Sequence, residues 1–430
     1  MSKKPKFQSP TGMHDVLPEE QKYFQKIYDV LFKAANFYGF EKIDTPVAEE
    51  TELFLKGIGL ATDIVGKQMY NFRTRGGDYL TLRPEGTAPV VRAFIEHGMY
   101  NLPQPIKLWY FGPFFRYERP QAGRYRQFWQ FGFEVLGEES PVIDAQIIQI
   151  FYNILKELKL KKLIIEVNSI GDSQCRPYYK KLLISYFKSR EVSLCADCRR
   201  RLRENPLRIL DCKEEKCQPI KAQAPQMIDH LCETCHTHFK EVLEFLDELE
   251  LPYRLNPYLV RGLDYYAKTV FEIFEDSEEG RSKGALVGGG RYDSLVKILG
   301  GRDTPATGGA AGLERIVEML EQKITKPPKT GPVETPQIFL AQLGDLAKRQ
   351  SLKLMEDFRK KKIQVAESLG RDSLKTQLSK ANRIGVKYVL ILGQKEALDG
   401  TIIIRDMITR SQEIVKLDRV VREMEKRLKR

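Results

Sequence analysis

The sequence of 430 residues contains no run of about 18 consecutive apolar residues, the length that a helix needs to span a bilayer. Its beginning, MSKKPKFQSPTG, also lacks the apolar stretch of a secretory signal. These two absences predict a cytoplasmic protein with no membrane partner. The hydrophobic fraction of 42% supplies ample core material, so we expect a globular chain of two or three domains.

A phosphate-binding loop of the GxxxxGK[ST] type is absent from the sequence. Such a loop cradles the phosphates of a nucleotide with backbone amides, so a nucleotide bound to this chain needs other partners. Arginines projecting from a sheet are the alternative, because a guanidinium group binds phosphate oxygens in pairs.

Cysteine is missing from most of the chain, because all seven cysteines lie between Cys175 and Cys235. This placement does not resemble the disulfide framework of a secreted domain, so the thiols are expected to be free or metal-bound. Two CxxC pairs at this spacing are typical of a tetrahedral zinc site. The candidate ligands of a structural zinc ion are Cys195, Cys198, Cys232 and Cys235. The alternative is a set of reduced cysteines that pack in a core, and both interpretations stay open.

Positive charge is concentrated at one end of the chain. The formal net charge is +12, and residues 336–430 hold 22 lysines and arginines against 12 acidic residues. A concentrated basic excess gains affinity for nucleic acid by releasing counterions from the phosphates. We therefore expect a module that docks on nucleic acid there, with a solvated basic surface as the alternative.

A proline-rich segment divides the chain. KITKPPKTGPVETP, residues 323–336, contains four prolines and a glycine and is predicted to be an interdomain linker. Strand-like and helical patterns alternate after it, which predicts a small α/β domain with a largely parallel sheet at 337–430.

The part before the linker, residues 1–322, has a different pattern. A helix is predicted from Pro18 to Gly39, and strand patterns at 107–118 and 126–136 follow one another without a helix between them. This arrangement predicts an α+β domain built on an antiparallel sheet. Residues from about 171 to 257 are helical and bear the cysteines, so we interpret them as an insertion.

The hairpin at residues 107–136 separates its side chains by the parity of their numbers. The odd positions are large and apolar and are predicted to face the core; they are Trp109, Phe111, Phe115, Tyr117, Trp129, Phe131, Phe133 and Val135. The even positions near the turn combine polar groups with glycine, and they are Gly112, Arg116, Glu118, Gln130, Gly132 and Glu134. Glycines are uncommon on a solvated sheet face, so this pattern favours a binding site for a flat ligand.

Three segments of the sequence resemble the class II aminoacyl-tRNA synthetases. FRYERP with the downstream RYRQFWQFGFEV resembles motif 2 of that class, and GGAAGLERI, residues 308–316, resembles motif 3. GFEKIDTPVAEE, residues 39–50, is similar to motif 1. The match of Pro46 to the proline at the subunit interface of that class implies a homodimer.

Further segments narrow the resemblance to bacterial histidyl-tRNA synthetases. LVRGLDYY, residues 259–266, and GGGRYDSLV, residues 288–296, look like the two histidine-specific motifs of that family. TLRPEGTAPVVRA, residues 81–93, is similar to its amino-acid-binding loop. The resemblance extends over nearly the whole chain. It implies a class II catalytic domain, a C-terminal anticodon-binding domain, and ligation of histidine to tRNA(His) with ATP and Mg²⁺.

The resemblance also implies roles for single residues. Arg116 and Arg261 would be catalytic, with Arg116 on the α-phosphate and Arg261 stabilising the transition state. The ATP-binding residues would be Arg116, Glu118, Arg124 and Arg315, with Arg315 on the γ-phosphate. The histidine-binding residues would be Glu85, Gly86, Thr87, Gln130, Glu134, Arg261, Tyr265 and Tyr266. Among these, Glu134 and Tyr266 would contact the imidazole. The tRNA acceptor end would meet Arg119 and Gln121.

One alternative comes from another functional class. A regulatory paralogue of these synthetases serves as a subunit of ATP phosphoribosyltransferase, but it lacks the anticodon-binding domain and departs from the catalytic motifs. This sequence has the basic C-terminal segment and all three arginines, so the ligase is the preferred interpretation. The related synthetases for threonine, proline and glycine lack LVRGLDYY and GGGRYD.

Overall fold

The computed structural model describes residues 6–60, 62–121, 123–276, 284–323, 336–370 and 373–428. The chain divides into two compact units, Met1–Lys329 and Thr330–Arg430. The linker expected at 323–336 falls almost entirely outside the described residues. Within the described ranges, no helix is long and apolar enough to cross a membrane.

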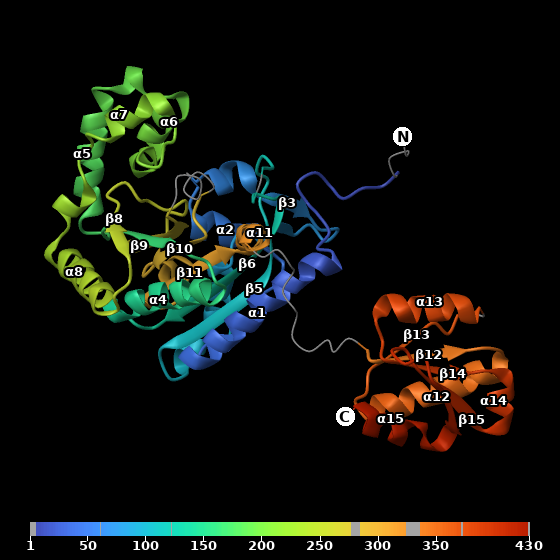
Figure 1. The fold of residues 1–430 in the computed structure, drawn as a ribbon. Coiled ribbons are helices and arrows are strands. Elements are labelled where there is room, and N and C mark those ends of the chain that lie inside the picture. The colour runs from blue at the N-terminus through green and yellow to red at the C-terminus, as the bar shows by residue number, and fades with distance from the viewer. Residues whose placement is uncertain are drawn as a thin grey trace. The chain divides into compact units, whose positions relative to one another are not determined.

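A sheet lies at the centre of the first unit, and the described residues form eight strands of it (Figure 1). The six inner strands are antiparallel, and the two edge strands pair in parallel with their neighbours. The expected antiparallel sheet is therefore confirmed. In spatial order the strands are β1 (Glu41–Lys42), β5 (Ile106–Phe115), β6 (Gln127–Leu136), β11 (Ala306–Gly312), β10 (Val287–Arg291), β9 (Ala267–Glu275), β7 (Leu163–Ser169) and β8 (Tyr253–Leu255).

The register of the inner strands preserves the parity of residue numbers. Gly132 lies opposite Ala310, Ala310 opposite Gly288, and Gly288 opposite Glu272. Because side chains alternate along a strand, these even positions share one face and the odd positions share the other. The odd face carries the main core and includes the fully or almost fully buried Trp109, Phe131, Phe133, Val135, Ile165, Phe271 and Ile273.

The predicted core face of the hairpin is largely confirmed. Phe111, Phe115 and Trp129 are partly buried. Tyr117 is wrong as a core residue, since 52% of its surface is exposed. Strand β5 ends at Phe115, so the alternation of faces no longer applies two residues later.

Helices α1 (Pro18–Tyr38), α4 (Pro141–Glu157), α8 (Glu233–Glu248) and α11 (Leu313–Lys323) contribute apolar side chains to this core. Helix α1 begins with Pro18 in its first turn, where no backbone donor is lost, and is terminated by Gly39 directly after it, whose φ of 73° suits a residue without a side chain. The first unit also contains α2 (Thr51–Ile58), α3 (Thr87–Glu96), α10 (Leu295–Ile298) and a small sheet of β2 (Ala48–Glu50), β4 (Tyr79–Leu82) and β3 (Tyr70–Arg73).

The segment expected as an insertion contains two kinds of structure. Helices α5 (Arg176–Lys188), α6 (Ala196–Glu204) and α7 (Gln218–Lys221) stand away from the sheet in Figure 1. Their buried residues join a second core that also includes residues of the even sheet face. Helix α8 instead packs beside α4 on the main core, and β8 extends the sheet.

The second unit contains a mixed sheet of five strands in its described residues. The order is β13 (Val365–Glu367), β12 (Ile338–Gln342), β14 (Tyr388–Leu392), β15 (Thr401–Asp406) and β16 (Gln412–Lys416). The first three strands are parallel as expected, but β15 and β16 are antiparallel. The largely parallel sheet was therefore only partly right. Its helices are α12 (Asp345–Lys360), α13 (Leu374–Ile384), α14 (Gln394–Asp399) and α15 (Val420–Leu428).

Candidate active site

A cavity of about 1100 Å³ lies over the even face of the central sheet. A row of small residues, Gly132, Ala310 and Gly288, crosses the middle of this face on three neighbouring strands. The two glycines leave room for neighbouring side chains to lie across the sheet, Tyr110 over Gly132 and Arg261 over Gly288. A Cβ on Gly288 would collide with the guanidinium group of Arg261, so this arginine can hold its present position only while residue 288 has no side chain.

Arg261 forms an ion pair with Glu272, the residue opposite Gly288 on β9. Both side chains are about one-fifth exposed, at 18% and 20%. Burial works against the charged guanidinium, but Glu272 together with Tyr266 and Tyr265 outweighs it, and the pKa of Arg261 is raised. Arg261 Nε is buried without a hydrogen-bond partner among the described residues. One donor of this arginine is thus fixed by the protein, and another is left for a ligand.

Arg116 follows the last residue of β5 and reaches the loop before α3. Its Nε donates to the Pro84 carbonyl oxygen at 2.8 Å, and its guanidinium carbon lies 5.3 Å from the centre of the Phe128 ring. Burial lowers the pKa of Arg116 from its ordinary value. A positive group held among aromatic and backbone partners is prearranged to receive an anion.

Glu85 fixes the loop that precedes α3. Its carboxylate accepts hydrogen bonds from the backbone amides of Thr87 at 2.7 Å and Ala88 at 2.8 Å, which caps the first turn of the helix. The Tyr265 hydroxyl donates to the same carboxylate at 3.2 Å. Burial raises the pKa of Glu85, although the two backbone donors oppose it. Glu85 therefore joins the loop to the LVRGLDYY segment.

Glu134 is fully buried on β6 and accepts three hydrogen bonds. The donors are the hydroxyl groups of Thr87 at 2.9 Å, Tyr110 at 3.4 Å and Tyr292 at 2.5 Å. Burial raises its pKa from 4.5 to about 8, against the effect of these donors. Thr87 and Tyr110 line the cavity, whereas Glu134 is absent from the lining residues. The carboxyl group thus lies one layer below the cavity surface.

Gln130 and Tyr266 present groups to the cavity itself. The amide oxygen of Gln130 is buried and accepts no hydrogen bond from the described residues. A buried acceptor without a donor is unfavourable, so a ligand with a positive or N–H group would satisfy it. The Tyr266 ring lies 5.6 Å from the Arg261 guanidinium carbon.

Arg315 and Arg124 occupy another part of the same cavity. Arg315 Nη1 donates to the Ala285 carbonyl oxygen at 2.6 Å, and Arg124 Nη1 lies 3.6 Å from Glu118 Oε2. Burial, and then the neighbouring Arg124, lower the pKa of Arg315. Two guanidinium groups close enough to disfavour each other's charge form a site for an anion.

The structure brings most of the predicted site residues to one cavity. The residues that line it are Glu85, Gly86, Thr87, Arg116, Glu118, Arg124, Gln130, Arg261, Tyr265, Tyr266 and Arg315. Arg119 and Gln121 do not line it and lie exposed on the hairpin turn.

The cysteines form two separate groups, which corrects the predicted zinc ligands. Among the described residues, one group consists of Cys195, Cys198, Cys212 and Cys217, and the other of Asp172, Cys175, Cys232 and Cys235. In each group the candidate ligand atoms all lie within 4.8 Å of one another. The two CxxC pairs therefore do not share one site, because the fold places α6 and the start of α8 in different surroundings.

Sequence reasoning missed several residues of the site. Glu272, Tyr110 and Tyr292 were given no role, although they contact Arg261 or Glu134. Tyr110 has an even number, so the alternation along the hairpin could have placed it on the same sheet face as the predicted site residues. The importance of Glu272 depends on the pairing of β9 with β10, for which a single sequence carries no local signal.

Comparisons with known proteins agree with this geometry. Residues 12–316 match the family model described as histidyl-tRNA synthetase, and residues 337–427 match an anticodon binding domain. A histidine–tRNA ligase of Dehalococcoides mccartyi is 44% identical over 422 residues, which cover 98% of this chain and 100% of that protein. The ligase of Caldicellulosiruptor saccharolyticus is 43% identical over 427 residues, with the same shares covered.

A solved structure extends the likeness to three dimensions. The crystal structure of apo S. aureus histidyl-tRNA synthetase matches with a TM-score of 0.78 at 35% identity, over 97% of this chain and 99% of that one. The family match spans well over half of the sequence, and the relatives are covered along their whole length. The chain therefore belongs to the histidyl-tRNA synthetase family.

Proposed function

We propose that this chain is a histidine–tRNA ligase, an aminoacyl-tRNA synthetase that activates L-histidine with ATP and transfers it to the 3′ end of tRNA(His). One observation carries the proposal. Arg116, Arg261 and Arg315 line the same cavity as a free amide acceptor and the Glu85 loop. An anionic nucleotide and a zwitterionic amino acid both find complementary groups there.

In the first step a carboxylate oxygen of histidine attacks the α-phosphorus of ATP. The bond to the β-phosphate breaks and pyrophosphate leaves, with Mg²⁺ entering as the partner of ATP. Negative charge develops on the α-phosphate, where Arg116 and Arg261 would stabilise it. Arg315 would hold the γ-phosphate, with Glu118 and Arg124 beside it.

Histidine would bind with its ammonium group at Gln130, Glu85 and Thr87. The unpartnered oxygen of Gln130 supports this assignment, since it needs a donor. The imidazole would lie against Tyr266, above the Glu134 layer. A site of buried polar groups rejects amino acids that cannot pair with them, because those groups would remain unsatisfied.

In the second step a terminal ribose hydroxyl of the tRNA attacks the histidyl carbonyl carbon and AMP leaves. Arg119 and Gln121, exposed on the hairpin turn, would contact the acceptor end. The basic unit at 337–430 would bind the anticodon, which its match to an anticodon binding domain supports. We assign residues 1–322 to the catalytic domain and expect a cytoplasmic homodimer with Pro46 at its interface.

The test is aminoacylation. The purified chain with ATP, Mg²⁺, labelled histidine and a tRNA(His) transcript should give histidine esterified to the tRNA. A tRNA transcript for another amino acid is the control and should remain uncharged. A chain that charges neither transcript with histidine, while binding ATP, would contradict the ligase and favour the regulatory paralogue.

A further inference from the structure

Four cysteines converge in the part of the chain that faces the sheet across the cavity. Cys195 precedes α6, Cys198 lies in its first turn, and Cys212 and Cys217 follow it. All four are buried, with at most 7% of any one exposed, and their sulfur atoms lie within 4.8 Å of one another. Cys195 and Cys212 also line the cavity.

The spacing of the sulfurs fits a metal ion better than a disulfide. The Cys195 and Cys212 sulfurs are 3.9 Å apart, whereas a disulfide joins sulfurs at about 2.05 Å. Four thiolates at about 2.3 Å from a central zinc ion have sulfurs about 3.8 Å apart at the corners of the tetrahedron. The group needs only small movements to reach that geometry.

The surroundings suit a negatively charged centre. The backbone amides of Cys198 and Cys195 donate to the sulfurs of Cys195 and Cys217, both at 3.3 Å. A zinc ion with four thiolates is net negative, and such donors stabilise it. Helix α6 carries four arginines within nine residues, which are Arg199, Arg200, Arg201 and Arg203. Among these, Arg201 interacts favourably with a Cys198 thiolate, although its closest partner is Asp63.

We propose that Cys195, Cys198, Cys212 and Cys217 bind one structural zinc ion, and that this ion positions the arginines between the cysteines against the active site. The ion would tie together both ends of the segment from Cys198 to Cys212. That segment contains Arg201 and Arg208, which both reach the catalytic part of the chain.

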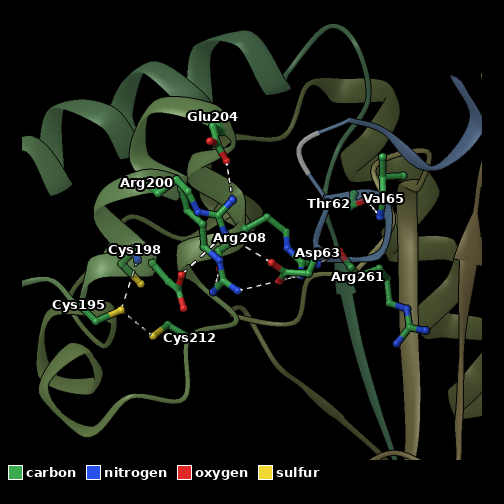
Figure 2. Close-up of polar contacts among 12 residues, drawn as sticks. Thr62, Asp63, Val65, Cys195, Cys198, Arg200, Glu204, Arg208, Cys212 and Arg261 are labelled. Atoms are coloured by element: carbon green, nitrogen blue, oxygen red, sulfur yellow. Dashed lines mark hydrogen bonds and ion pairs between the residues drawn. The ribbon is translucent and has the colours of Figure 1, made fainter. Parts of the chain in front are cut away.

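Figure 2 shows Arg208 and Asp63 together with the cysteine group and Arg261. Arg201 Nη2 donates to Asp63 Oδ2 at 3.0 Å. Arg208 Nη2 donates to the same oxygen at 3.4 Å. Arg208 Nη1 donates to the backbone carbonyl oxygen of Arg261 at 3.0 Å. Arg208 is thus a positioning residue for the backbone of Arg261. This second half of the proposal rests on the proposed function, but the metal site does not.

The metal site is tested by elemental analysis of the untagged, full-length chain. Cys198→Ser and Cys212→Ser should each lower the zinc content by one ion per chain. Cys175→Ser changes the other cysteine group. The double variant Cys175→Ser, Cys212→Ser should contain one zinc ion per chain less than Cys175→Ser alone. A parent chain without zinc, or an unchanged zinc content in both single variants, overturns the proposal.

A measurement on the parent chain removes the dependence on variants that fold poorly. An organomercurial that captures thiols should release the zinc of the folded protein, followed with a chromogenic chelator. Release of at least one ion per chain is expected, and release of none overturns the site.

The positioning role is tested with Arg208→Ala. Pyrophosphate exchange should slow by about 10- to 100-fold in kcat, with a smaller change in the KM for histidine and no loss of zinc. Arg203→Ala, five residues before Arg208 in the segment between the cysteines and with 79% of its side chain exposed, is the matched control and should keep the parental rate. An unchanged rate in Arg208→Ala overturns the positioning role alone. A parent chain without histidine-dependent exchange overturns the proposed function and leaves the zinc result standing.

Discussion

The hydroxyl group of Tyr292 donates a hydrogen bond of 2.5 Å to the fully buried carboxyl group of Glu134. The two residues belong to segments far apart in the sequence, the GGGRYDSLV motif and the hairpin strand β6. Thr87 donates to the other carboxyl oxygen, which adds the TLRPEGTAPVVRA segment to the same network. One side chain therefore sets the relative position of three motifs beneath the cavity.

Stability should depend on pH through Glu134. Its pKa is raised from 4.5 to about 8 by burial, so the folded chain keeps a proton that the unfolded chain has released. Raising the pH between these values therefore destabilises the fold, by up to about 1.4 kcal/mol per pH unit. Glu134→Gln carries no such proton, so its stability relative to the parent should increase from pH 5 to pH 8. Urea denaturation at each pH measures the difference, and a difference that stays constant would contradict the buried protonated carboxyl.

Arg261→Ala should impair the chemical step more than substrate binding. Arg261 has a free buried Nε and would act on charge that develops at the α-phosphate. Loss of one such donor slows catalysis by about 10²- to 10³-fold. Single-turnover formation of the adenylate gives the rate, and calorimetry gives the affinity for histidine. Equal losses in the two measurements would show that Arg261 only holds the substrate.

Gly288→Ala should disturb Arg261 without removing it. The added methyl group would collide with the guanidinium group and force it to move from its place beside Glu272. We expect a loss of activation rate comparable to that of Arg261→Ala. Gly66→Ala is the control, because its added Cβ meets no atom within 4 Å beyond its own chain neighbours and the local helix backbone. A fully active Gly288→Ala would mean that Arg261 can work from another position.

Gln130→Ala should weaken histidine binding and change the rate constant of adenylate formation little. A hydrogen bond to a charged group contributes about 1.5–3 kcal/mol, so the dissociation constant for histidine should rise by about 10- to 100-fold. Calorimetry with L-histidine and with histidinol, which keeps the ammonium group, should show similar losses for both. A loss limited to histidine would place Gln130 at the carboxylate instead.

Much of the site-bearing fold follows from local patterns. The burial of Trp109, Phe131 and Phe133 could be predicted because alternation along a strand is a local rule, and antiparallel pairing preserved it across the sheet. The rule failed at Tyr117, where the strand had ended. Strand β16 was missed because its residues are mostly exposed and give no clear alternation of apolar and polar positions.

Other features depend on contacts between distant segments. The spacing of the cysteines identified two CxxC pairs, but the completion of each pair, by Cys212 and Cys217 or by Asp172 and Cys175, is a property of the folded chain. The pairing of Arg261 with Glu272 likewise requires the strand order, which one sequence does not specify. The resemblance to a family predicted the site residues. The structure added their contacts, such as those of Glu272 with Arg261 and of Tyr292 with Glu134.

The most direct test of the central claim is exchange of labelled pyrophosphate into ATP, measured with each of the twenty amino acids. Exchange occurs only if the aminoacyl-adenylate forms and reverts to ATP, so it requires ATP and the amino acid to bind in the same cavity as the three arginines. Exchange that depends on L-histidine, and on no other amino acid to a comparable degree, is the predicted result. Exchange with a different amino acid, or no exchange with any, would contradict the account.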